Sequence, residues 1–256
     1  QGTVVIDAQN VAICSPVTSN TKETVIVRTI GTVVVKDMID FCIVFVEDYP
    51  FMRSRIDKLI NESLALRIDQ QVLLGSGVAP EMFSIDSYSS EFSAANPACD
   101  VSASIQAANY IDLVSAMATQ IIELGQQNAY DPNVVIVNKC DWFKEVESLK
   151  DLDNNYLDTR VARDINGMPT INGRRVVWSP LVPQNELYVL DSNKGEILDR
   201  RDITIDVAFE NRDNFESELA TIKGRARLNL LVDVNNQNAF MKCSDVATAI
   251  AAITKT

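Results

Sequence analysis

The side chains most often used for acid–base catalysis and zinc binding are absent or scattered in this sequence. Its 256 residues include no histidine, which excludes Ser-His-Asp and Cys-His catalysis, histidine-bound zinc and a histidine-based pH switch. The five cysteines are Cys14, Cys42, Cys99, Cys140 and Cys243, and no two of them form a Cys-x-x-Cys pair. This arrangement indicates reduced, structural thiols rather than a zinc or redox site.

Two stretches begin like ligand-binding motifs but lack the residues that complete them. Residues 151–155 start like a calcium loop, but Tyr156 replaces the sixth-position glycine and Ala162 the twelfth-position glutamate. Residues 75–77 read Gly-Ser-Gly, part of a dinucleotide-binding fingerprint, but Pro80 replaces the third glycine and the segment follows a predicted helix. We therefore expect neither a bound metal nor a cofactor. The acidic stretch is interpreted as a solvated junction between a helix and a loop.

The charge balance argues against tight binding of nucleic acid. Acidic residues outnumber basic ones by 35 to 23, which gives a formal net charge of −12. Proteins that hold nucleic acid tightly displace its counterions with clustered Lys and Arg, and this sequence has no basic run. Nor does any pair of carboxylates stand out by its spacing in an apolar setting, as a glycosidase acid pair would. An inert wall that repels DNA phosphates and a soluble enzyme both fit this composition.

The composition predicts a globular protein of one large or two modest domains. Hydrophobic residues make up 46% and charged residues 23% of the chain, which is enough to build a substantial core. The sequence contains no apolar run of about 18 residues, so we predict no membrane span. The start of the chain shows no charged segment followed by an apolar one, so we also predict no secretory signal.

A long helix over residues 51–74 is the strongest local signal. Isoleucine, leucine or valine recurs every fourth residue from Ile56 to Val72, and no proline or glycine interrupts the segment. Asp48 and Pro50 suit its start and Gly75 its end. At 1.5 Å per residue, such a helix is about 35 Å long, which is typical of a spine across a flat domain.

The segments around this helix predict an α+β protein. β-Branched runs at 24–27 and 32–35 and an apolar run at 41–46 predict strands before the helix. Residues 78–200 read as a loop followed by a mixed α/β region, with helices at 105–124 and 142–149 and short strands at 134–137, 176–178 and 186–191. A last apolar segment is predicted at 246–253.

Two runs near the end of the chain alternate between apolar and polar residues. Residues 203–209 and 220–232 follow this period of two, and the turn 211–215 separates them. The pattern predicts a long antiparallel hairpin with one buried and one solvated face.

Three segments, in this order and spacing, resemble the major capsid proteins of tailed phages with the Hong Kong ninety-seven shell fold. Residues 33–77 are similar to the family's strand, spine helix and glycine-rich exit. Residues 134–142, which end in Asp141 and Trp142, are similar to its axial-domain strand and the helix start that follows. Residues 202–231, centred on the Arg-Asp-Asn-Phe turn, are similar to its peripheral-domain hairpin.

The resemblance implies how the chain is divided. Residues 39–77 and 201–232 would form a peripheral domain that contains the spine helix and the long hairpin. Residues 78–200 and 233–256 would form an inserted, mixed α/β axial domain that meets its copies around five- and six-fold axes. Residues 1–38 would form an N-terminal arm with a shortened extended loop.

The resemblance also implies a structural role rather than an enzymatic one. Copies of the chain would assemble as pentamers and hexamers into the icosahedral shell of a phage or prophage. This shell would form in the bacterial cytoplasm and enclose double-stranded DNA without binding it tightly. Portal, scaffold and decoration proteins are further candidate partners, and a membrane is not. The family often loses an N-terminal scaffolding segment, and a chain that begins at Gln1 is consistent with this or with trimming.

The hairpin carries the residues that we expect to contact neighbouring subunits. The polar face of its second strand and its turn supply the candidates, which are Arg212, Asp213, Asn214, Phe215, Lys223, Arg225 and Arg227. The alternative is that these residues form a solvated hairpin with no partner.

Covalent joining of subunits is not expected. Some family members join subunits by Lys–Asn isopeptide bonds, assisted by a glutamate on the hairpin. Counting from Phe215, this chain has Glu218 where the asparagine would be and Arg225 where the glutamate would be. We therefore predict no self-crosslinking.

Two other classes of protein remain open at this point. An encapsulin-type nanocompartment shares the shell fold but encloses cargo enzymes. A cytosolic α/β enzyme that works through carboxylates would instead have an acidic cleft and measurable turnover.

Overall fold

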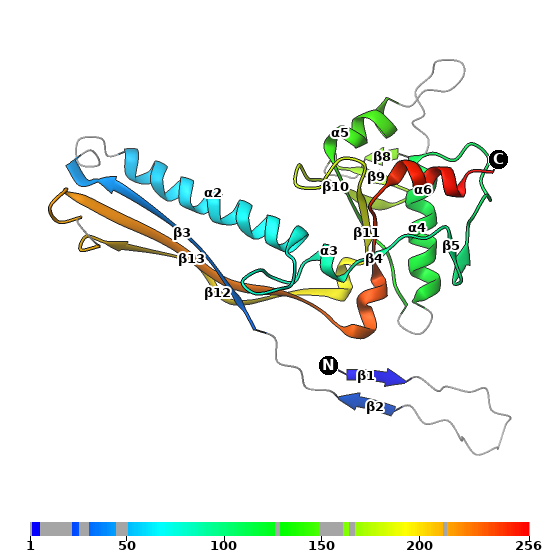
Figure 1. Cartoon of the computed structure of the whole chain (residues 1–256), viewed down its shortest axis with the longest axis horizontal. Helices are drawn as coiled ribbons and strands as arrows, with labels where there is room; N and C mark the ends of the chain where they lie inside the picture. Colours follow the sequence, from blue (N-terminus) through cyan, green and yellow to red (C-terminus); the bar gives the residue numbers. More distant parts are fainter. Residues whose placement is uncertain are drawn as a thin grey trace. The chain divides into compact units, whose positions relative to one another are not determined.

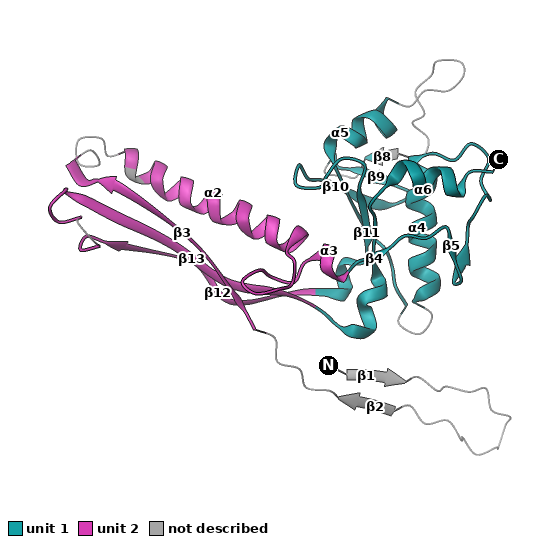
Figure 2. Ribbon diagram, viewed as in Figure 1, with its two compact units in different colours: residues 1–30, 89–195, 232–256 teal, residues 31–88, 196–231 magenta. Residues whose placement is uncertain are grey.

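The computed structural model describes residues 2–5, 22–25, 31–44, 51–125, 129–148, 161–163, 167–211 and 214–255. The chain forms two compact units, shown in different colours in Figure 2. Unit 1 comprises residues 1–30, 89–195 and 232–256, and unit 2 comprises residues 31–88 and 196–231. The calcium-like stretch 151–155 lies outside the described residues.

Unit 2 combines a three-stranded sheet with one long helix (Figure 1). The strands are β3 (Val33–Cys42), β12 (Gly195–Ala208) and β13 (Leu219–Val232), with β13 in the centre. β3 and β13 are antiparallel, in a register that runs from Leu219 opposite Cys42 to Leu228 opposite Val33. Residues 31–38, which we expected in the N-terminal arm, therefore belong to unit 2, because β3 is hydrogen-bonded along its length to the central strand.

Helix α2 (Phe51–Leu74) has the limits that the sequence predicts. Its fourfold apolar series places Ile56, Ile60 and Leu64 in the core of unit 2, against Ile222 and Leu228 of β13 and their neighbours. The short helix α3 (Ile85–Tyr88) follows it. The first residues of the predicted apolar run 41–46 continue β3 to Cys42, and residues 45 and 46 lie outside the described residues.

Gly224 allows the helix to approach the sheet closely. A Cβ atom at this position would lie 2.5 Å from Leu64 Cδ1 and 2.6 Å from Ile60 Cγ2. Its neighbours on the same face, Ile222 and Ala226, are buried. A glycine in a strand interior usually weakens the strand, and here it creates the space that the two helix side chains fill.

Unit 1 is built on a seven-stranded mixed sheet in the order β4-β14-β11-β7-β10-β9-β8. Pairs of β7 with β10 and of β14 with β4 are parallel, and the other pairs are antiparallel. The strands, in chain order, are β4 (Ser90–Glu91), β7 (Val134–Val137), β8 (Val161–Arg163), β9 (Pro169–Ile171), β10 (Arg174–Trp178), β11 (Leu187–Leu190) and β14 (Phe240–Cys243).

The helices of unit 1 begin where side-chain caps are available. Helix α4 (Tyr110–Leu124) starts at a capping box between Asn109 and Asp112, five residues later than the sequence predicted. Helix α5 (Lys139–Trp142) continues as a π-helical turn (Phe143–Glu147) and replaces the predicted helix 142–149. Helix α6 (Val246–Ile253) matches its predicted limits. Two 3₁₀ turns span Ser192–Lys194 and Val234–Ala239.

Two small strand pairs complete the described structure. β1 (Gly2–Val5) pairs with β2 (Lys22–Val25), close to one of the strands predicted before the long helix. β5 (Ala95–Asn96) pairs with β6 (Cys99–Asp100) in the serine- and alanine-rich segment predicted as a loop. Each unit thus combines helices with a largely antiparallel sheet, which confirms the α+β class.

The N-cap of α6 should make the stability of unit 1 depend on pH in the acid range. Hydrogen bonds from Thr248 and Asn185 lower the pKa of Asp245 to about 2. A carboxyl group whose pKa is lower when folded stabilises the fold above its unfolded pKa and loses this effect as the pH falls through the folded one. We expect the melting temperature of unit 1 to fall between about pH 4 and pH 2. Calorimetry across this range should show a smaller decrease for Asp245→Ala, and an unchanged decrease would contradict this role.

Candidate subunit-contact surface

The turn between β12 and β13 is held by hydrogen bonds within the chain. Asn214 is buried, and its Nδ2 donates to Thr221 Oγ1 at 2.8 Å, while Asn211 Nδ2 donates to the same oxygen at 3.2 Å. Thr221 Oγ1 in turn donates to Asp40 on β3. The backbone N–H of Leu219 donates to the Asn214 carbonyl at 2.9 Å. Asn214 therefore shapes the turn from inside, and its amide already has a partner within the subunit.

This turn presents Phe215 to solvent. Phe215 is 87% exposed, the highest value among the large apolar side chains that the structure describes. Glu218, the residue at the expected crosslinking position, is also exposed and has a left-handed backbone with φ of +51°. Arg212 and Asp213 lie outside the described residues. An apolar ring that unfavourably contacts water on a fixed turn is suited to burial against another surface.

The outer face of β13 carries the three predicted basic residues. Lys223, Arg225 and Arg227 alternate with the buried Gly224 and Ala226 and are half-buried, which confirms the alternation in the sequence. Arg225 makes an ion pair of 3.0 Å with Asp206 of β12, and its Nε donates to Thr204 Oγ1 at 3.4 Å. Arg227 Nε is buried without a hydrogen-bond partner within the described structure.

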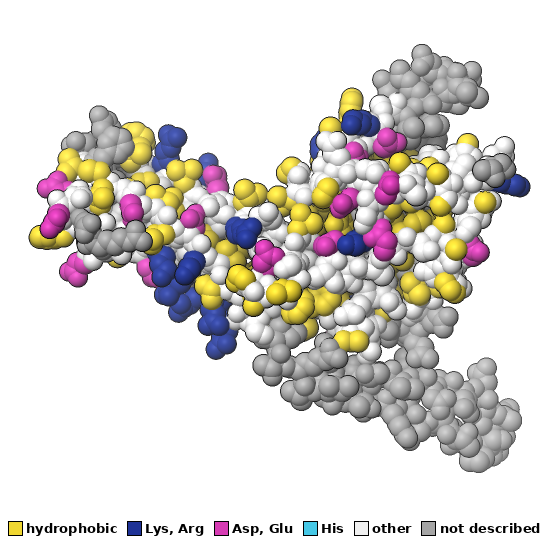
Figure 3. Space-filling view, in the orientation of Figure 1, with side chains coloured by type: hydrophobic (Ala, Val, Ile, Leu, Met, Phe, Trp, Pro, Cys, Tyr) yellow, Lys and Arg dark blue, Asp and Glu magenta, His cyan; other side chains and the backbone are white. Residues whose placement is uncertain are grey.

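β3 extends this basic face with exposed apolar side chains. The antiparallel register places Val34, Lys36 and Met38 directly opposite Arg227, Arg225 and Lys223. Val34 and Met38 are each about half exposed, at 49% and 47%. Lys and Arg side chains gather over the strands of unit 2 in Figure 3. The outer face of β3 and β13 is thus basic and partly apolar, although the whole chain has a net charge of −12.

The apolar face of β12 is less buried than the sequence predicted. Ile205 packs against the core of unit 2, but Ile203, Val207 and Phe209, at 39%, 48% and 57% exposure, do not. The alternation of apolar and polar residues predicted this face correctly. Its exposure arises because α2, about 10 Å wide, can cover only about two strands that lie 4.8 Å apart. The position of β12 at the edge of the sheet, beyond the reach of α2, is the feature that sequence reasoning missed.

The glycine-rich loop after α2 is folded on its own chain. The Ser76 N–H donates to Glu81 Oε2 at 3.0 Å, and hydrogen bonds from Ser76 lower the pKa of the Glu81 carboxyl. A Cβ on Gly75 would lie 2.5 Å from the Met82 carbonyl oxygen, so the loop is packed closely against the following segment. The Ser76 N–H of this loop is thus already bonded to a carboxylate of the same chain.

The described part of the chain lacks the features of a metal centre and of a membrane span. It contains no group of three or more Cys, Asp or Glu side chains placed to hold a metal ion. No described helix is both long enough and apolar enough to cross a membrane.

A comparison with known sequences identifies the class of protein. The sequence profile of the phage capsid family matches residues 15–245, and the chain therefore belongs to the phage capsid family. Among curated proteins, it is similar to the major capsid protein of Enterobacteria phage HK97, with 24% identity over 191 residues. The aligned region covers 72% of this chain but only 44% of that relative, so the chain spans less than half of the relative's length.

Solved structures share the fold over almost the whole chain. A structure from Gordonia phage Cozz has a TM-score of 0.67 at 12% identity and covers 95% of this chain and 79% of its own. A structure described as the capsid of an empty GTA particle has a TM-score of 0.62 at 14% identity, with 95% and 83% covered. These similarities confirm the capsid-type fold that the three sequence segments indicated.

Proposed function

We propose that this chain is the shell-forming subunit of a phage capsid and assembles with copies of itself. The family match over residues 15–245 is the observation that carries the proposal. The exposed Phe215, the apolar edge of β12 and the basic face of β13 supply surfaces suited to contacts between copies. A closed shell needs such heterologous contacts, in which one patch of a subunit meets a different patch of the next.

The finer parts of the proposal follow the family resemblance. Unit 2 would act as the peripheral domain and the part of unit 1 from residue 89 onward as the axial domain, around which pentamers and hexamers form. The shell would assemble in the host cytoplasm, enclose double-stranded DNA and remain without enzymatic activity. Portal, scaffold and decoration proteins are further proposed partners. With a net charge of −12, the wall would repel DNA rather than bind it tightly.

Size-exclusion chromatography with light scattering, followed by negative-stain microscopy, tests assembly directly. We expect closed shells, rings of subunits or sheets of hexamers at high protein concentration. A chain that remains monomeric at every salt concentration and under crowding would contradict the proposal. Denaturing electrophoresis of the assembled material should show monomers, because Glu218 stands where the asparagine of the isopeptide bond would be and Arg225 where the assisting glutamate would be. Covalent ladders would contradict the absence of crosslinking.

Phe215→Ser should weaken assembly without weakening the fold. The side chain is 87% exposed, so its removal should change the free energy of unfolding by less than about 0.5 kcal/mol. Loss of a buried aromatic contact between copies should raise the protein concentration needed for assembly by about tenfold. Light scattering across a concentration series measures this shift. Phe215→Leu keeps an apolar side chain and should retain most of the assembly, whereas normal assembly of the serine variant would remove Phe215 from the contact.

A further inference from the structure

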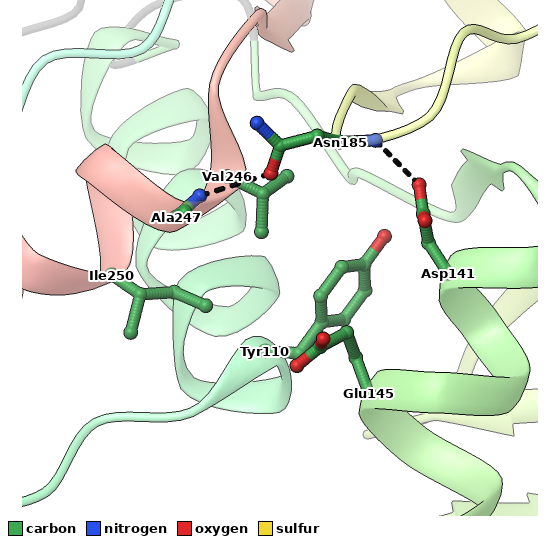
Figure 4. Close-up of a pocket in the computed structure, with 7 residues that line it drawn as sticks. All are labelled: Tyr110, Asp141, Glu145, Asn185, Val246, Ala247 and Ile250. Atoms are coloured by element: carbon green, nitrogen blue, oxygen red, sulfur yellow. Dashed lines mark hydrogen bonds between the residues drawn. The ribbon is translucent and has the colours of Figure 1, made fainter.

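Unit 1 contains a small cavity whose two sides differ in chemistry (Figure 4). Tyr110 at the start of α4, Asp141 of α5 and Glu145 of the π-helical turn supply oxygen atoms. The apolar side comes from α6, through Val246, Ala247 and Ile250. The cavity has a volume of about 90 Å³, which is the space of roughly three water molecules.

The Tyr110 hydroxyl is a buried polar group for which the described residues supply no hydrogen-bond partner. The side chain is 1% exposed, and its hydroxyl has no hydrogen bond to any described residue. In Figure 4 the hydroxyl points to the side of the cavity where Asp141 and Asn185 lie. A buried hydroxyl without a hydrogen bond costs free energy, so such groups in folded proteins usually have a partner. The buried hydroxyl therefore marks this cavity as a candidate ligand site.

Asn185 fixes the rim of this cavity. Its backbone N–H donates to Asp141 Oδ2 at 2.6 Å, its Oδ1 accepts from the Ala247 N–H at 3.2 Å, and its Nδ2 donates to Asp245 Oδ1 at 2.8 Å. Its backbone is in the left-handed region, with φ of +67°. All its side-chain hydrogen-bonding atoms thus have partners, and it joins the starts of α5 and α6. The groups left to meet an occupant are two carboxylates and the Tyr110 hydroxyl.

The acidic groups of the cavity determine which charge a ligand should carry. Burial, together with the negative charges of Asp141, Cys243 when ionised, and Glu145, raises the pKa of Tyr110 above its ordinary value. The hydroxyl therefore stays protonated and neutral at physiological pH, with lone pairs that can accept a hydrogen bond. Asp141 lies on the hydroxyl side of the cavity and Glu145 nearer the backbone end of Tyr110 (Figure 4), and these two carboxylates repel anions and favour a cation.

We propose that this cavity binds a primary ammonium group carried on an alkyl chain. An ammonium has three N–H donors and no acceptor, which matches the three acceptor groups of Tyr110, Asp141 and Glu145. Its alkyl chain would pack on Val246 and Ile250. The ammonium comes either from a small free amine or from a lysine of a second copy of this chain. The inference does not depend on the proposed shell function.

A bare metal ion fits this cavity less well. Calcium takes six to eight oxygen ligands and magnesium a near-complete octahedron. The cavity offers two carboxylates and one phenol, the side-chain atoms of Asn185 are already hydrogen-bonded, and the rest of the wall is aliphatic. The described residues also contain no metal-binding group of three acidic or thiol side chains.

Titration of the full chain with n-butylamine at neutral pH, followed by calorimetry or by NMR of α4 and α6, tests the proposal. n-Butylamine reproduces the lysine side chain, and n-butanol is its uncharged control. We expect n-butylamine to bind and n-butanol not to bind. Glu145→Gln should weaken the affinity for n-butylamine at least about fivefold, because it removes one negative charge. Tyr110→Phe should weaken it about threefold or more, because it removes one acceptor.

Both variants should fold, since Glu145 is exposed and the Tyr110 hydroxyl has no partner to lose. Glu123→Gln is the matched control, because it removes the same charge from the exposed surface of α4 and should leave the affinity unchanged. Equal n-butylamine affinity in the native chain and in all three variants would overturn the proposal, since binding would then lie elsewhere.

A carbodiimide, which joins an ammonium to a carboxylate in contact with it, distinguishes the two sources. Treatment at the highest attainable protein concentration, followed by mass spectrometry, would detect a link between Glu145 and a lysine of another copy. Such a link, suppressed by n-butylamine, assigns the ammonium to the second copy. Binding of n-butylamine without this link assigns it to a free amine. The absence of both n-butylamine binding and the link would overturn the proposal.

Discussion

Gly224→Val is expected to lower the free energy of unfolding of unit 2 by about 2–3 kcal/mol. Even the first added carbon would lie 2.5 Å from Leu64 Cδ1 and 2.6 Å from Ile60 Cγ2, and both helix side chains are fully buried. α2 would have to move away from the sheet or its side chains would have to leave their rotamers. Both tryptophans are in unit 1, so hydrogen exchange of α2 and far-UV circular dichroism, rather than fluorescence, report this change.

A double variant separates this steric effect from a general loss of strand stability. Leu64→Ala alone should cost about 2–5 kcal/mol, because it leaves a cavity in the same place. Combined with Gly224→Val, it makes room for the valine. The double variant should therefore lose at least about 1 kcal/mol less free energy of unfolding than the two single variants lose together. Gly31→Ala is the control, since a Cβ at Gly31 meets no atom within 4 Å. Additive costs would show that Gly224 does not set the distance between helix and sheet.

Trp142→Ala is expected to destabilise unit 1 by about 3–5 kcal/mol. The ring is 1% exposed, lies 6.4 Å from the ring of Trp178, and its Nε1 donates to Glu147 Oε1 at 2.9 Å. Truncation would leave a large void and remove the hydrogen bond that ties the π-helical turn to α5. Urea unfolding followed by the fluorescence of the remaining Trp178 measures the change.

Two further variants give this prediction its controls. Phe143 is the next residue on the same segment but is 58% exposed, so Phe143→Ala should change the stability by less than about 0.5 kcal/mol. Trp142→Phe keeps most of the apolar ring and loses the N–H. Its destabilisation should therefore lie between that of Phe143→Ala and that of Trp142→Ala. If Phe143→Ala and Trp142→Ala cost the same, the destabilisation would reflect the helix and not the buried ring.

Elements defined by a local pattern could be predicted from the sequence. The fourfold series from Ile56 to Val72, bounded by Pro50 and Gly75, predicted the limits of α2, and the alternation after residue 220 predicted which residues of β13 face the core. Both signals arise because one face of each element is buried over its whole length.

Features that depend on distant parts of the chain could not be predicted in this way. Helix α4 was predicted to begin near residue 105, but Ile105 bridges to Thr254 near the other end of the chain. Asn214 was predicted to contact a neighbouring subunit, and its hydrogen bonding within the subunit depends on Thr221 and, through it, on Asp40 of β3. The ammonium cavity collects residues from four segments, and no spacing in the sequence brings them together.

The uncovered apolar edge of β12 also affects how a dispersed subunit behaves in solution. Ile203 and Val207 of β12, with Phe209 just beyond its end, form a strip that water solvates poorly, and β12 lies at the edge of its sheet. Such a strip attracts other chains at short range, whereas the net charge of −12 repels them at distances up to the Debye length. The colloidal stability of the subunit is therefore a balance between a short-range attraction that salt leaves intact and a longer-range repulsion that salt screens. Ionic strength thus acts on the encounter between subunits rather than on the fold of each one.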